Sequence, residues 1–300
     1  TIPVFVDDLF RFEQLPFDLD ELPATFSKFR KVVEKKPRLL PDRPIDSRSM
    51  GGCIPSVWAD PAEWKEALEI PLDPSIEVPT HGGAKSASRH WKAYLDARAL
   101  SHYKQTRNAF QGPMQSSHLS VWLAHGCISP RQIWWDTLQY EQDVEANEST
   151  YWLRFELLWR EYFRWYSRAS DWTLFRRTGP SDQVFGFDQN ARRFERWKTG
   201  HTDCDIVDAA MRELNETGWM SNRARQLVAS HLIYESNLDW RLGAAYFESQ
   251  LVDFDVASNW GNWAYIAGVG PDPRGGRIFH LNDQADRYDP DGSYRRRWLP

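Results

Sequence analysis

The stretch at residues 151–168, YWLRFELLWREYFRWYSR, decides the fold class of this chain of 300 residues. It sets four large aromatic side chains at positions i, i+3, i+7 and i+11, which form one stripe along an α-helix: Trp152, Phe155, Trp159 and Phe163. Arg160, Arg164 and Arg168 follow one another at i+4 on a neighbouring face. The stretch therefore predicts an amphipathic helix with an aromatic face.

Helical patterns continue on both sides of this stretch, from about residue 83 onward. A helix is predicted from Ile206 to Gly218, because glycine suits the position that follows a helix. Two more are predicted at 222–235 and 239–252. Few segments show the alternation of apolar and polar residues that is typical of β-strands. We therefore expect an all-α fold, with a helical domain at 81–300.

The first eighty residues are different, because prolines interrupt them repeatedly. One helix is predicted at 22–36, with Pro23 in its first turn and Pro37 ending it. A second is predicted from Pro61 to Leu68. We interpret the rest of 1–80 as an extended linker that wraps over a body or joins two bodies.

Composition excludes several classes of protein. The net charge of −5 argues against nucleic-acid binding by bulk electrostatics, so any DNA contact would need a local basic patch. Cys53, Cys127 and Cys204 are widely spaced, which indicates neither a disulfide framework nor a zinc site. No apolar run is long enough to span a membrane, and no signal sequence opens the chain, so we expect neither a membrane span nor secretion.

Motif searches exclude other chemistries. Neither GxGxxG nor GxxxxGK[ST] occurs, so both common nucleotide-binding loops are missing from the sequence. The eight histidines are scattered without an HExxH pattern, and we expect no metal site. A hydrolase receives no support from a GxSxG motif. The 16 tryptophans suit thick helix packing or a bound aromatic ligand.

Five ordered segments carry a specific resemblance: SHYKQTRNAFQGPMQSSHLSVWLAHGCIS at 101–129, ANESTYWLRFELLWREYFRW at 146–165, VDAAMRELNETGWMSNRARQLVAS at 207–230, DWRLGAAYFESQLVDFDVASNWGNWAYIAGVGPDPR at 239–274, and DRYDPDGSYRRRWLP at 286–300. Together they resemble the C-terminal, FAD-binding domain of the photolyase/cryptochrome family, with the cryptochrome DASH branch as the nearest likeness. The opening residues resemble the linker that precedes this domain, and the family's N-terminal antenna domain has no counterpart here.

The resemblance implies an FAD site with two ends. At the phosphate end it implies contacts from Tyr103, Ser116, Ser117 and Ser120, with Arg107 nearby, and it counts Arg160 among the cofactor-binding residues. Hydroxyl groups at the start of a helix suit a pyrophosphate, because helix N-termini expose unpaired N–H groups. An ordinary serine-capped helix is the alternative.

At the isoalloxazine end, the resemblance implies that the pair Arg225–Asp253 lies beside the ring. Asp255 would lie near N3 and the ribityl chain, Asn259 would face N5, and Asn222 would complete the site. Such a pair would tune the protonation and redox state of the flavin. A salt bridge between helices, with no ligand, is the alternative.

The implied reaction is light-driven electron transfer from reduced FAD to a cyclobutane pyrimidine dimer that is flipped out of DNA. A deoxyribodipyrimidine photolyase of this kind is a carbon–carbon lyase. The resemblance places Glu156, Trp159, Asn222, Gln226 and Tyr265 around the lesion, with tyrosine at 265 similar to DASH proteins that act on single-stranded DNA. It counts Glu156 and Asn259 as catalytic, with Trp240 and Trp263 as the inner members of a tryptophan relay to the flavin.

Three departures from the family pattern bear on activity. Phe187 stands where the outer relay tryptophan is expected, so photoreduction should be slow or rerouted through Trp197 or Trp172. His118 replaces the usual lysine or arginine after the paired hydroxyls, and a histidine is largely neutral near pH 7.

The third departure is the turn TDCDIVD at 202–208. Asp203 and Asp205 replace a glycine and a proline there, and two added carboxylates would repel a nearby DNA backbone.

Two functions therefore stay open from the sequence. One is a DASH-type photolyase acting on damaged or single-stranded DNA. The other is a repair-inactive flavin-binding domain, which serves as a subunit of a larger assembly or as a light or redox sensor. Protein partners would cover the surface on which an antenna domain docks. We expect an organellar location, plastid before mitochondrion, or a cytoplasmic one.

Overall fold

The computed structural model describes residues 8–35, 39–44, 81–181, 186–272 and 274–300. This described part is helical, and its one β pairing is an isolated bridge between Asp188 and Leu238. The all-α expectation is therefore confirmed. The helix predicted from Pro61 to Leu68 lies outside the described residues, as does most of the proline-rich segment.

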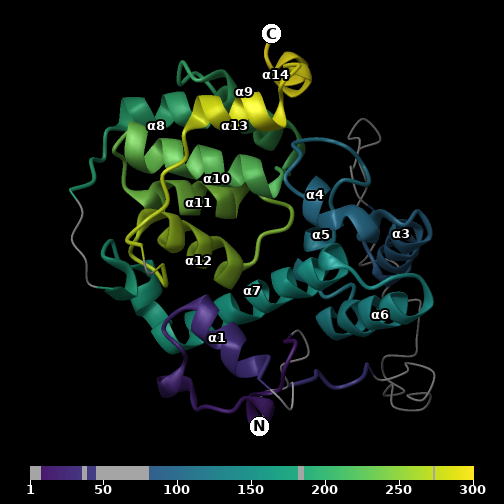
Figure 1. Cartoon of the computed structure of the whole chain (residues 1–300). Helices are drawn as coiled ribbons and strands as arrows, with labels where there is room; N and C mark the ends of the chain where they lie inside the picture. The colour runs from purple at the N-terminus through teal and green to yellow at the C-terminus, as the bar shows by residue number, and fades with distance from the viewer. Residues whose placement is uncertain (1–7, 36–38, 45–80, 182–185, 273) are drawn as a thin grey trace, which may run out of the picture.

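The helices fall into two groups along the chain (Figure 1). The first group is η1 (Phe12–Gln14), η2 (Leu19–Glu21), α1 (Phe26–Val33), α3 (Ala84–Asp96), η5 (Ala99–His102), α4 (Tyr103–Thr106), α5 (Ser120–Ala124), α6 (Pro130–Asp143) and α7 (Glu148–Ser170). The second is η6 (Asp171–Phe175), η7 (Gly179–Ser181), α8 (Ala191–Lys198), α9 (Asp205–Thr217), α10 (Asn222–Ser230), the π-helical turn η8 (His231–Glu235), α11 (Trp240–Gln250), α12 (Val256–Ala267), α13 (Leu281–Tyr288) and α14 (Ser293–Trp298).

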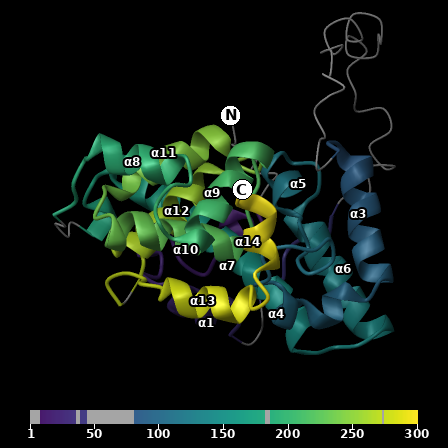
Figure 2. The ribbon, with the colours of Figure 1, turned by 90° about the horizontal axis from the view of Figure 1, so that it is seen from above.

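Each group has its own hydrophobic core. One core gathers side chains from α1 and from α3 to α7, and the other gathers side chains from α8 to α14. Viewed from above, α3, α5 and α6 lie on one side of the molecule, and α8, α9 and α11 on the other (Figure 2). Helix α7 joins the two sides, because it packs on α6 and α1 in the first group and on α12 in the second.

Helix α7 forms where its sequence predicts it and extends three residues before the quoted stretch. Asn147 caps its first turn by accepting hydrogen bonds from the backbone N–H groups of Ser149 and Thr150, at 2.8 and 3.1 Å. Its leucines and Tyr162 enter the first core. The predicted aromatic stripe faces the cavity described below, to which all four of its members contribute.

Two glycines allow close packing in the second group. Gly261 of α12 lies where a Cβ would overlap the ring of Phe163 of α7. Gly243 of α11 lies where a Cβ would overlap the indole of Trp263. Both helices therefore come nearer to their neighbours than any residue with a side chain would allow.

The N-terminal helix is shorter than predicted. The sequence placed Pro23 in the first turn of a helix at 22–36, but α1 begins at Phe26. Thr25 has extended backbone angles, and its hydroxyl accepts a hydrogen bond from the N–H of Lys28 at 3.4 Å. The threonine is therefore the N-cap, and Pro23 lies outside the helix.

The other helix boundaries agree more closely with the sequence. Helix α9 ends at Thr217 and is followed by Gly218 in the left-handed conformation, at φ 68°, as predicted. The predicted helix at 222–235 is α10 followed by a π-helical turn. No helix within the described ranges combines the length and the apolar character needed to cross a bilayer.

A buried hydrogen bond fastens α14 to α9. The phenol of Tyr294 donates to Glu213 Oε2 at 2.5 Å, and the two side chains are 1% and 6% exposed. Burial raises the pKa of Glu213 to about 7, and the hydrogen bond from Tyr294 only partly opposes this. The folded protein therefore holds a proton on Glu213 at a pH where the unfolded chain has lost it.

Replacing Glu213 with glutamine should change how stability depends on pH. Since the pKa of Glu213 is raised in the folded state, its contribution is full below about pH 4.5 and declines until pH 7 is passed. We expect the native chain to lose roughly 2–3 kcal/mol through this group between pH 5 and 8. E213Q should not show this loss in thermal unfolding experiments.

E216Q provides the matched control, because Glu216 lies on the same helix with an exposed side chain. This variant should keep the pH dependence of the native chain. Equal slopes for E213Q and the native chain would contradict the assignment.

Candidate functional site

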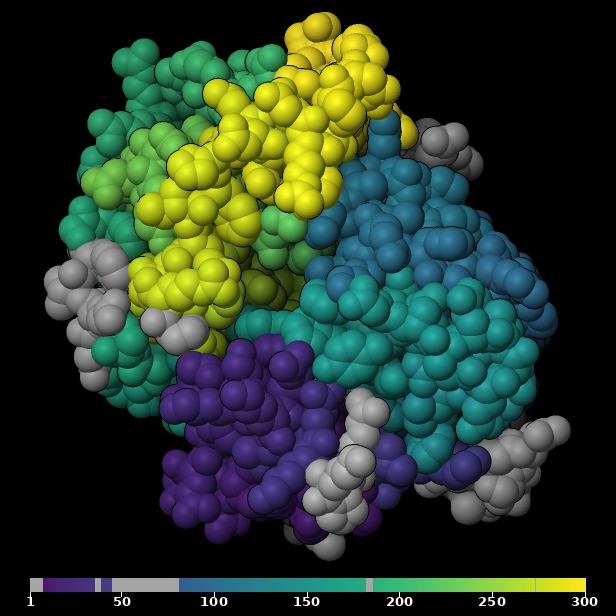
Figure 3. Space-filling view, viewed as in Figure 1, coloured from purple at the N-terminus to yellow at the C-terminus, as the bar shows by residue number. Residues whose placement is uncertain are grey.

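A cavity of about 490 Å³ lies where the two cores meet. Its walls come from α4, α5 and α7 on one side and from α10, α12 and the segment after α12 on the other. The molecular surface is hollowed between α7 and the segment that follows α12 (Figure 3). Both the volume and the mixture of aromatic and polar side chains are typical of small-molecule and cofactor sites.

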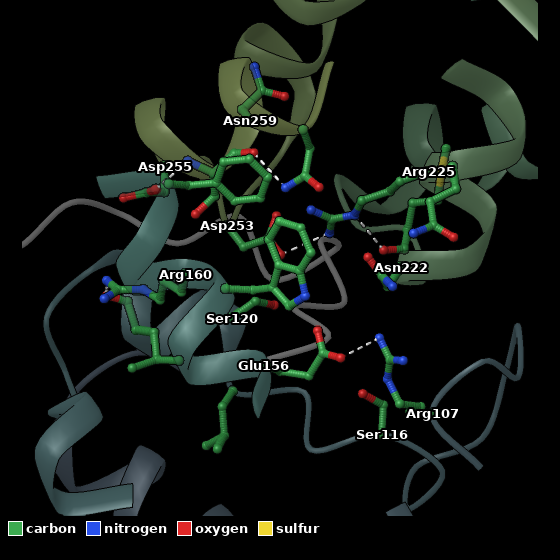
Figure 4. A pocket seen from close by; sticks show the side chains of 18 of the residues that line it. Arg107, Ser116, Ser120, Glu156, Arg160, Asn222, Arg225, Asp253, Asp255 and Asn259 are labelled. Carbon is green, nitrogen blue, oxygen red and sulfur yellow. Dashed lines mark hydrogen bonds and ion pairs between the residues drawn. The ribbon is translucent and has the colours of Figure 1, made fainter. Parts of the chain in front are cut away.

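An ion pair lies at the wall of this cavity. Arg225 of α10 donates through Nη2 to Asp253 Oδ2 at 2.8 Å, and through Nε to the carbonyl oxygen of Met220 at 2.8 Å (Figure 4). Asp253 is only 6% exposed, and its Oδ1 atom has no hydrogen-bond partner among the described residues. A buried carboxylate oxygen without a donor is unfavourable, so the site fits a ligand that brings an N–H group.

Two further side chains at the same end are held in fixed positions. Asp255 is the N-cap of α12, with Oδ1 accepting from the N–H of Ser258 at 2.8 Å and Oδ2 from Arg164 Nη1 at 3.2 Å. Asn259 is 8% exposed, and its Nδ2 donates to the carbonyl oxygen of Ala244 at 2.9 Å. Arg225, Asp253, Asp255 and Asn259 therefore line the same cavity.

Hydroxyl groups gather at another part of the cavity. Ser116, Ser117 and Ser120 line it, together with Tyr103 and Arg160. Helix α5 begins only at Ser120, so Ser116 and Ser117 lie in the preceding turn, not in the first turn of a helix. The hydroxyls still share the cavity wall, which suits a polar or anionic group of a ligand.

His118 is half-buried beside these serines in a strained backbone conformation. Its φ angle is 50°, its Nε2 lies 3.2 Å from the carbonyl oxygen of Gly112, and its ring packs on that of Trp219 at 4.9 Å. Burial lowers the pKa of His118, so the neutral ring is favoured without a ligand. The lysine or arginine of the family pattern would instead bring a permanent charge to this position.

Arg107 pairs with Glu156 across the cavity. Arg107 Nη2 lies 2.8 Å from Glu156 Oε1, and both side chains are largely buried (Figure 4). Burial raises the pKa of Glu156, and the guanidinium of Arg107 opposes this effect. The ion pair joins a residue predicted at the cofactor phosphates to one predicted at the substrate, a contact that the sequence did not indicate.

Trp159 lies between an N-terminal helix and the cavity. Its ring stacks on Phe26 of α1 at 3.8 Å with an interplanar angle of 14°, and it meets Tyr265 edge to face at 5.5 Å. Asn222 and Gln226 of α10 line the same cavity, and Gln226 Oε1 is buried without a partner in the described chain. The sequence placed Phe26 in the predicted helix at 22–36 but did not indicate its contact with Trp159.

The tryptophans predicted as an electron relay have aromatic neighbours. Trp263 lines the cavity and packs on Trp197 at 6.1 Å, while Trp240 packs on Trp260 at 5.7 Å. Phe187 is 9% exposed. The side chain of Arg177 donates a hydrogen bond to the backbone carbonyl oxygen of Phe187, and the backbone carbonyl oxygen of Arg177 accepts one from the indole N–H of Trp240. Trp172 is 59% exposed and packs under Arg176.

Known proteins resemble this chain in sequence and in fold. Residues 152–300 match the family model of the FAD binding domain of DNA photolyase. The cryptochrome DASH of Vibrio parahaemolyticus is 48% identical over 98% of this chain and 64% of its own length. The crystal structure of a cryptochrome from Synechocystis has a TM-score of 0.82 and 41% identity, over 98% of this chain and 61% of that one. This chain belongs to the photolyase/cryptochrome family.

Relatives from other sources agree. The cryptochrome DASH of Arabidopsis thaliana, described as chloroplastic/mitochondrial, is 41% identical over 96% of this chain and 51% of its own length. The chain thus spans about half to two thirds of the length of these relatives. Its cofactor is FAD, since the family model covers an FAD-binding domain and the polar groups of the cavity fit a flavin.

Among the described residues, no cluster of histidine, cysteine, aspartate and glutamate side chains is arranged to hold a metal ion. Cys127 and Cys204 are free thiols, and Cys53 lies outside the described residues.

Replacing Asp253 with asparagine should weaken FAD binding. The change leaves Arg225 without its carboxylate and removes a negatively charged acceptor from the cavity wall. A hydrogen bond to a charged group contributes about 1.5–3 kcal/mol, so we expect the dissociation constant to rise about tenfold to hundredfold. Titration of the apoprotein with FAD, followed by flavin fluorescence, measures this change.

D289N is the control, because Asp289 is 2% exposed and pairs with Arg295 at 2.9 Å away from the cavity. It should lower stability and leave FAD affinity unchanged. An unchanged dissociation constant for D253N would contradict the role of the pair.

Proposed function

We propose that this chain is the flavin domain of a DASH-type photolyase, which repairs cyclobutane pyrimidine dimers in single-stranded DNA under blue light. The observation that carries the proposal is one cavity with two sets of groups. The pair Arg225–Asp253 lines it at one end, and Glu156 and Trp159 line it at another. A cofactor and a flipped base could therefore meet in one place.

The groups near Glu156 suit a nucleobase. Glu156, Asn222 and Gln226 supply hydrogen-bonding groups of the kind that recognise base edges, and Gln226 Oε1 needs a donor. Trp159 and Tyr265 supply aromatic surface, and stacking of a base on such a ring contributes about 1–3 kcal/mol. Those interactions would offset the cost of unstacking a lesion, which is smaller in single strands.

Bound FAD supplies the electron that splits the dimer, and the residues of this chain would orient both partners. Glu156 would hydrogen-bond the damaged bases, and Asn259 would face the flavin ring near N5. Asp255 and Asp253 would hold the ring edge. The net charge of −5 means that DNA must be held by local cationic groups near the cavity, and Arg277, which lines it and pairs with Asp272, is one such group.

E156Q should separate substrate binding from cofactor binding. The amide keeps the size of the side chain but loses the acceptor charge and the ion pair with Arg107. We expect repair of dimer-containing single-stranded DNA to slow at least about tenfold, since a charge-assisted hydrogen bond is lost. Bound FAD per chain should stay near the native amount.

E148Q controls for a glutamate change on α7, because Glu148 is exposed in the first turn and contacts Lys104. It should repair at the native rate. Native repair by E156Q would remove Glu156 from the substrate site.

A repair-inactive flavin domain, as a sensor or an assembly subunit, is the second candidate. The turn at Asp203 favours it, because this residue has a φ of 69° in a region that favours glycine and pairs with Arg196 at 2.5 Å. The added carboxylate would repel a DNA backbone there. Flavin bands that respond to light without repair of single-stranded DNA would decide for this candidate.

The relay departure yields a separate prediction. Phenylalanine is far harder to oxidise than tryptophan, so Phe187 should interrupt electron flow through Trp240. We expect F187W to accelerate photoreduction of the bound flavin several-fold, as followed by absorbance under blue light with a thiol donor. W197F should slow the native rate, because Trp197 packs on Trp263.

The matched control is F17W, which adds an indole away from both Trp240 and Trp197, because Phe17 packs on Phe29 against the first core. If F187W photoreduces no faster than the native chain, position 187 is not the outer relay site.

Location and partners are further proposals. We infer an organellar location, plastid before mitochondrion, with a cytoplasmic one as the alternative, and the support is the description of the Arabidopsis relative. Fractionation of source cells would decide between them. Protein partners that cover the antenna-docking surface would appear as co-purifying chains.

A further inference from the structure

A short N-terminal segment is fastened to α7 by both backbone and side chain. Glu161 accepts hydrogen bonds from the N–H groups of Leu9 and Phe10, at 2.8 and 3.0 Å. Arg131 Nε donates to the carbonyl oxygen of Asp8 at 3.0 Å. The segment, Asp8–Leu9–Phe10, therefore lies against α7.

Asp8 is the charged member of this segment, and its side chain is 0% exposed. Its Oδ1 accepts from Arg164 Nε at 2.6 Å, and its Oδ2 from Arg168 Nη2 at 2.8 Å. A fully buried carboxylate loses much solvation, and it is tolerated because two guanidinium groups meet it. An apolar side chain would fill the same space without that requirement, so anchoring alone does not explain the charge.

The guanidinium of Arg164 also contacts a residue that lines the cavity. Arg164 Nη1 donates to Asp255 Oδ2 at 3.2 Å, while Nε of the same group holds Asp8. The guanidinium is planar and rigid, so fixing one edge fixes the direction of the other. Asp8 and Asp255 are thus joined through one side chain, although 247 positions separate them in the sequence (255 − 8).

This connection sets the orientation of Asp255. Its Oδ1 is held by the N–H of Ser258 in the cap of α12, and its Oδ2 is held by Arg164. With both oxygens held, the plane of the carboxylate is fixed relative to the cavity that it lines. Removing either contact would let the carboxylate rotate about its own side-chain bonds.

The surrounding charges explain why Asp8 matters to Arg164. Asp8 pairs with both Arg164 and Arg168, Arg164 also pairs with Asp255, and the carboxylate of Glu161 on α7 holds the backbone of the residues that follow Asp8. Burial and the charge of Asp8 raise the pKa of Glu161, which reduces its competition for the guanidinium groups. The shorter contact of Arg164, to Asp8, therefore determines where this guanidinium lies when it meets Asp255.

We propose that Asp8 is a positioning residue for the flavin site, which acts through Arg164 to orient Asp255 toward FAD. The N-terminal segment thereby contributes to cofactor affinity without contacting the cofactor. The inference rests on FAD occupying this cavity beside Asp255, and it does not depend on repair activity.

A double-mutant cycle on the full chain tests the proposal. FAD dissociation constants are measured for the native chain, D8N, D255N and the double variant, by titration of apoprotein in the dark. We expect D8N to raise the dissociation constant about three- to tenfold, which is part of the effect of one charge-assisted hydrogen bond. On the D255N background the same change should have no effect.

D42N is the matched control. Asp42 also forms an ion pair in the N-terminal region, with Arg11 at 2.6 Å, but within the described chain it contacts no residue at the cavity wall. It should bind FAD like the native chain. Equal fold-changes from D8N on both backgrounds, or none on either, would overturn the proposal. A native chain that takes up no FAD would instead refute occupancy of the cavity.

R164K tests the same connection if D8N does not fold. Lysine keeps the charge but cannot hold two carboxylates through a rigid fork. With Asp8 intact, R164K should raise the dissociation constant by a similar factor, and this effect should vanish on the D255N background. If R164K binds FAD with the native dissociation constant, the proposal is overturned, just as it is if D8N leaves that constant unchanged.

Discussion

The close approach of α7 and α12 is the constraint on which the site depends. Gly261 leaves room for the ring of Phe163, and at the next position of α7 the side chain of Arg164 reaches the cap of α12 at Asp255. Steric fit and charge therefore act on the same pair of helices. Because α7 belongs to the first core and α12 to the second, their contact fixes how the cores sit around the cavity. A methyl group at position 261 would separate the cores, and the pocket walls with them.

Buried charge gives this cavity its chemical character. Arg225 with Asp253, Arg107 with Glu156, and Arg164 with Asp255 each place a guanidinium beside a carboxylate at its walls. Paired groups of this kind contribute little net stability when buried, compared with apolar packing. Their value lies in orientation, since each holds donor and acceptor atoms in fixed directions before any ligand arrives. Asp253 Oδ1 and Gln226 Oε1 are buried and lack hydrogen-bond partners in the described chain, so these are two acceptor atoms that a ligand could satisfy.

Sequence periodicity predicted the helices and their faces, because both depend on residues that are near in the chain. The stripe on α7 and the glycine after α9 are examples, and both agree with the structure. The members of the flavin site were predicted from a resemblance, which transfers positions but not contacts. The stack of Phe26 on Trp159, the pair of Arg107 with Glu156 and the reach of Asp8 to Arg164 join residues more than 40 positions apart. Such contacts follow from packing of whole helices, and no local pattern encodes them. The start of α1 was wrong because a threonine cap outweighed the preference of proline for a first turn.

The stack of Phe26 on Trp159 ties the interior of the pocket to the outside of the molecule. Trp159 presents one face to α1 and therefore has a single face left for anything that enters. A smaller side chain at 159 would open a void on the α1 side, and Phe26 would move inward to fill it. Trp159 thus separates the cavity from the side chains of α1, and its size must fit the space on both sides. Loss of function on changing it would combine a missing surface with a collapsed neighbour, and only a compensating enlargement at position 26 would separate the two.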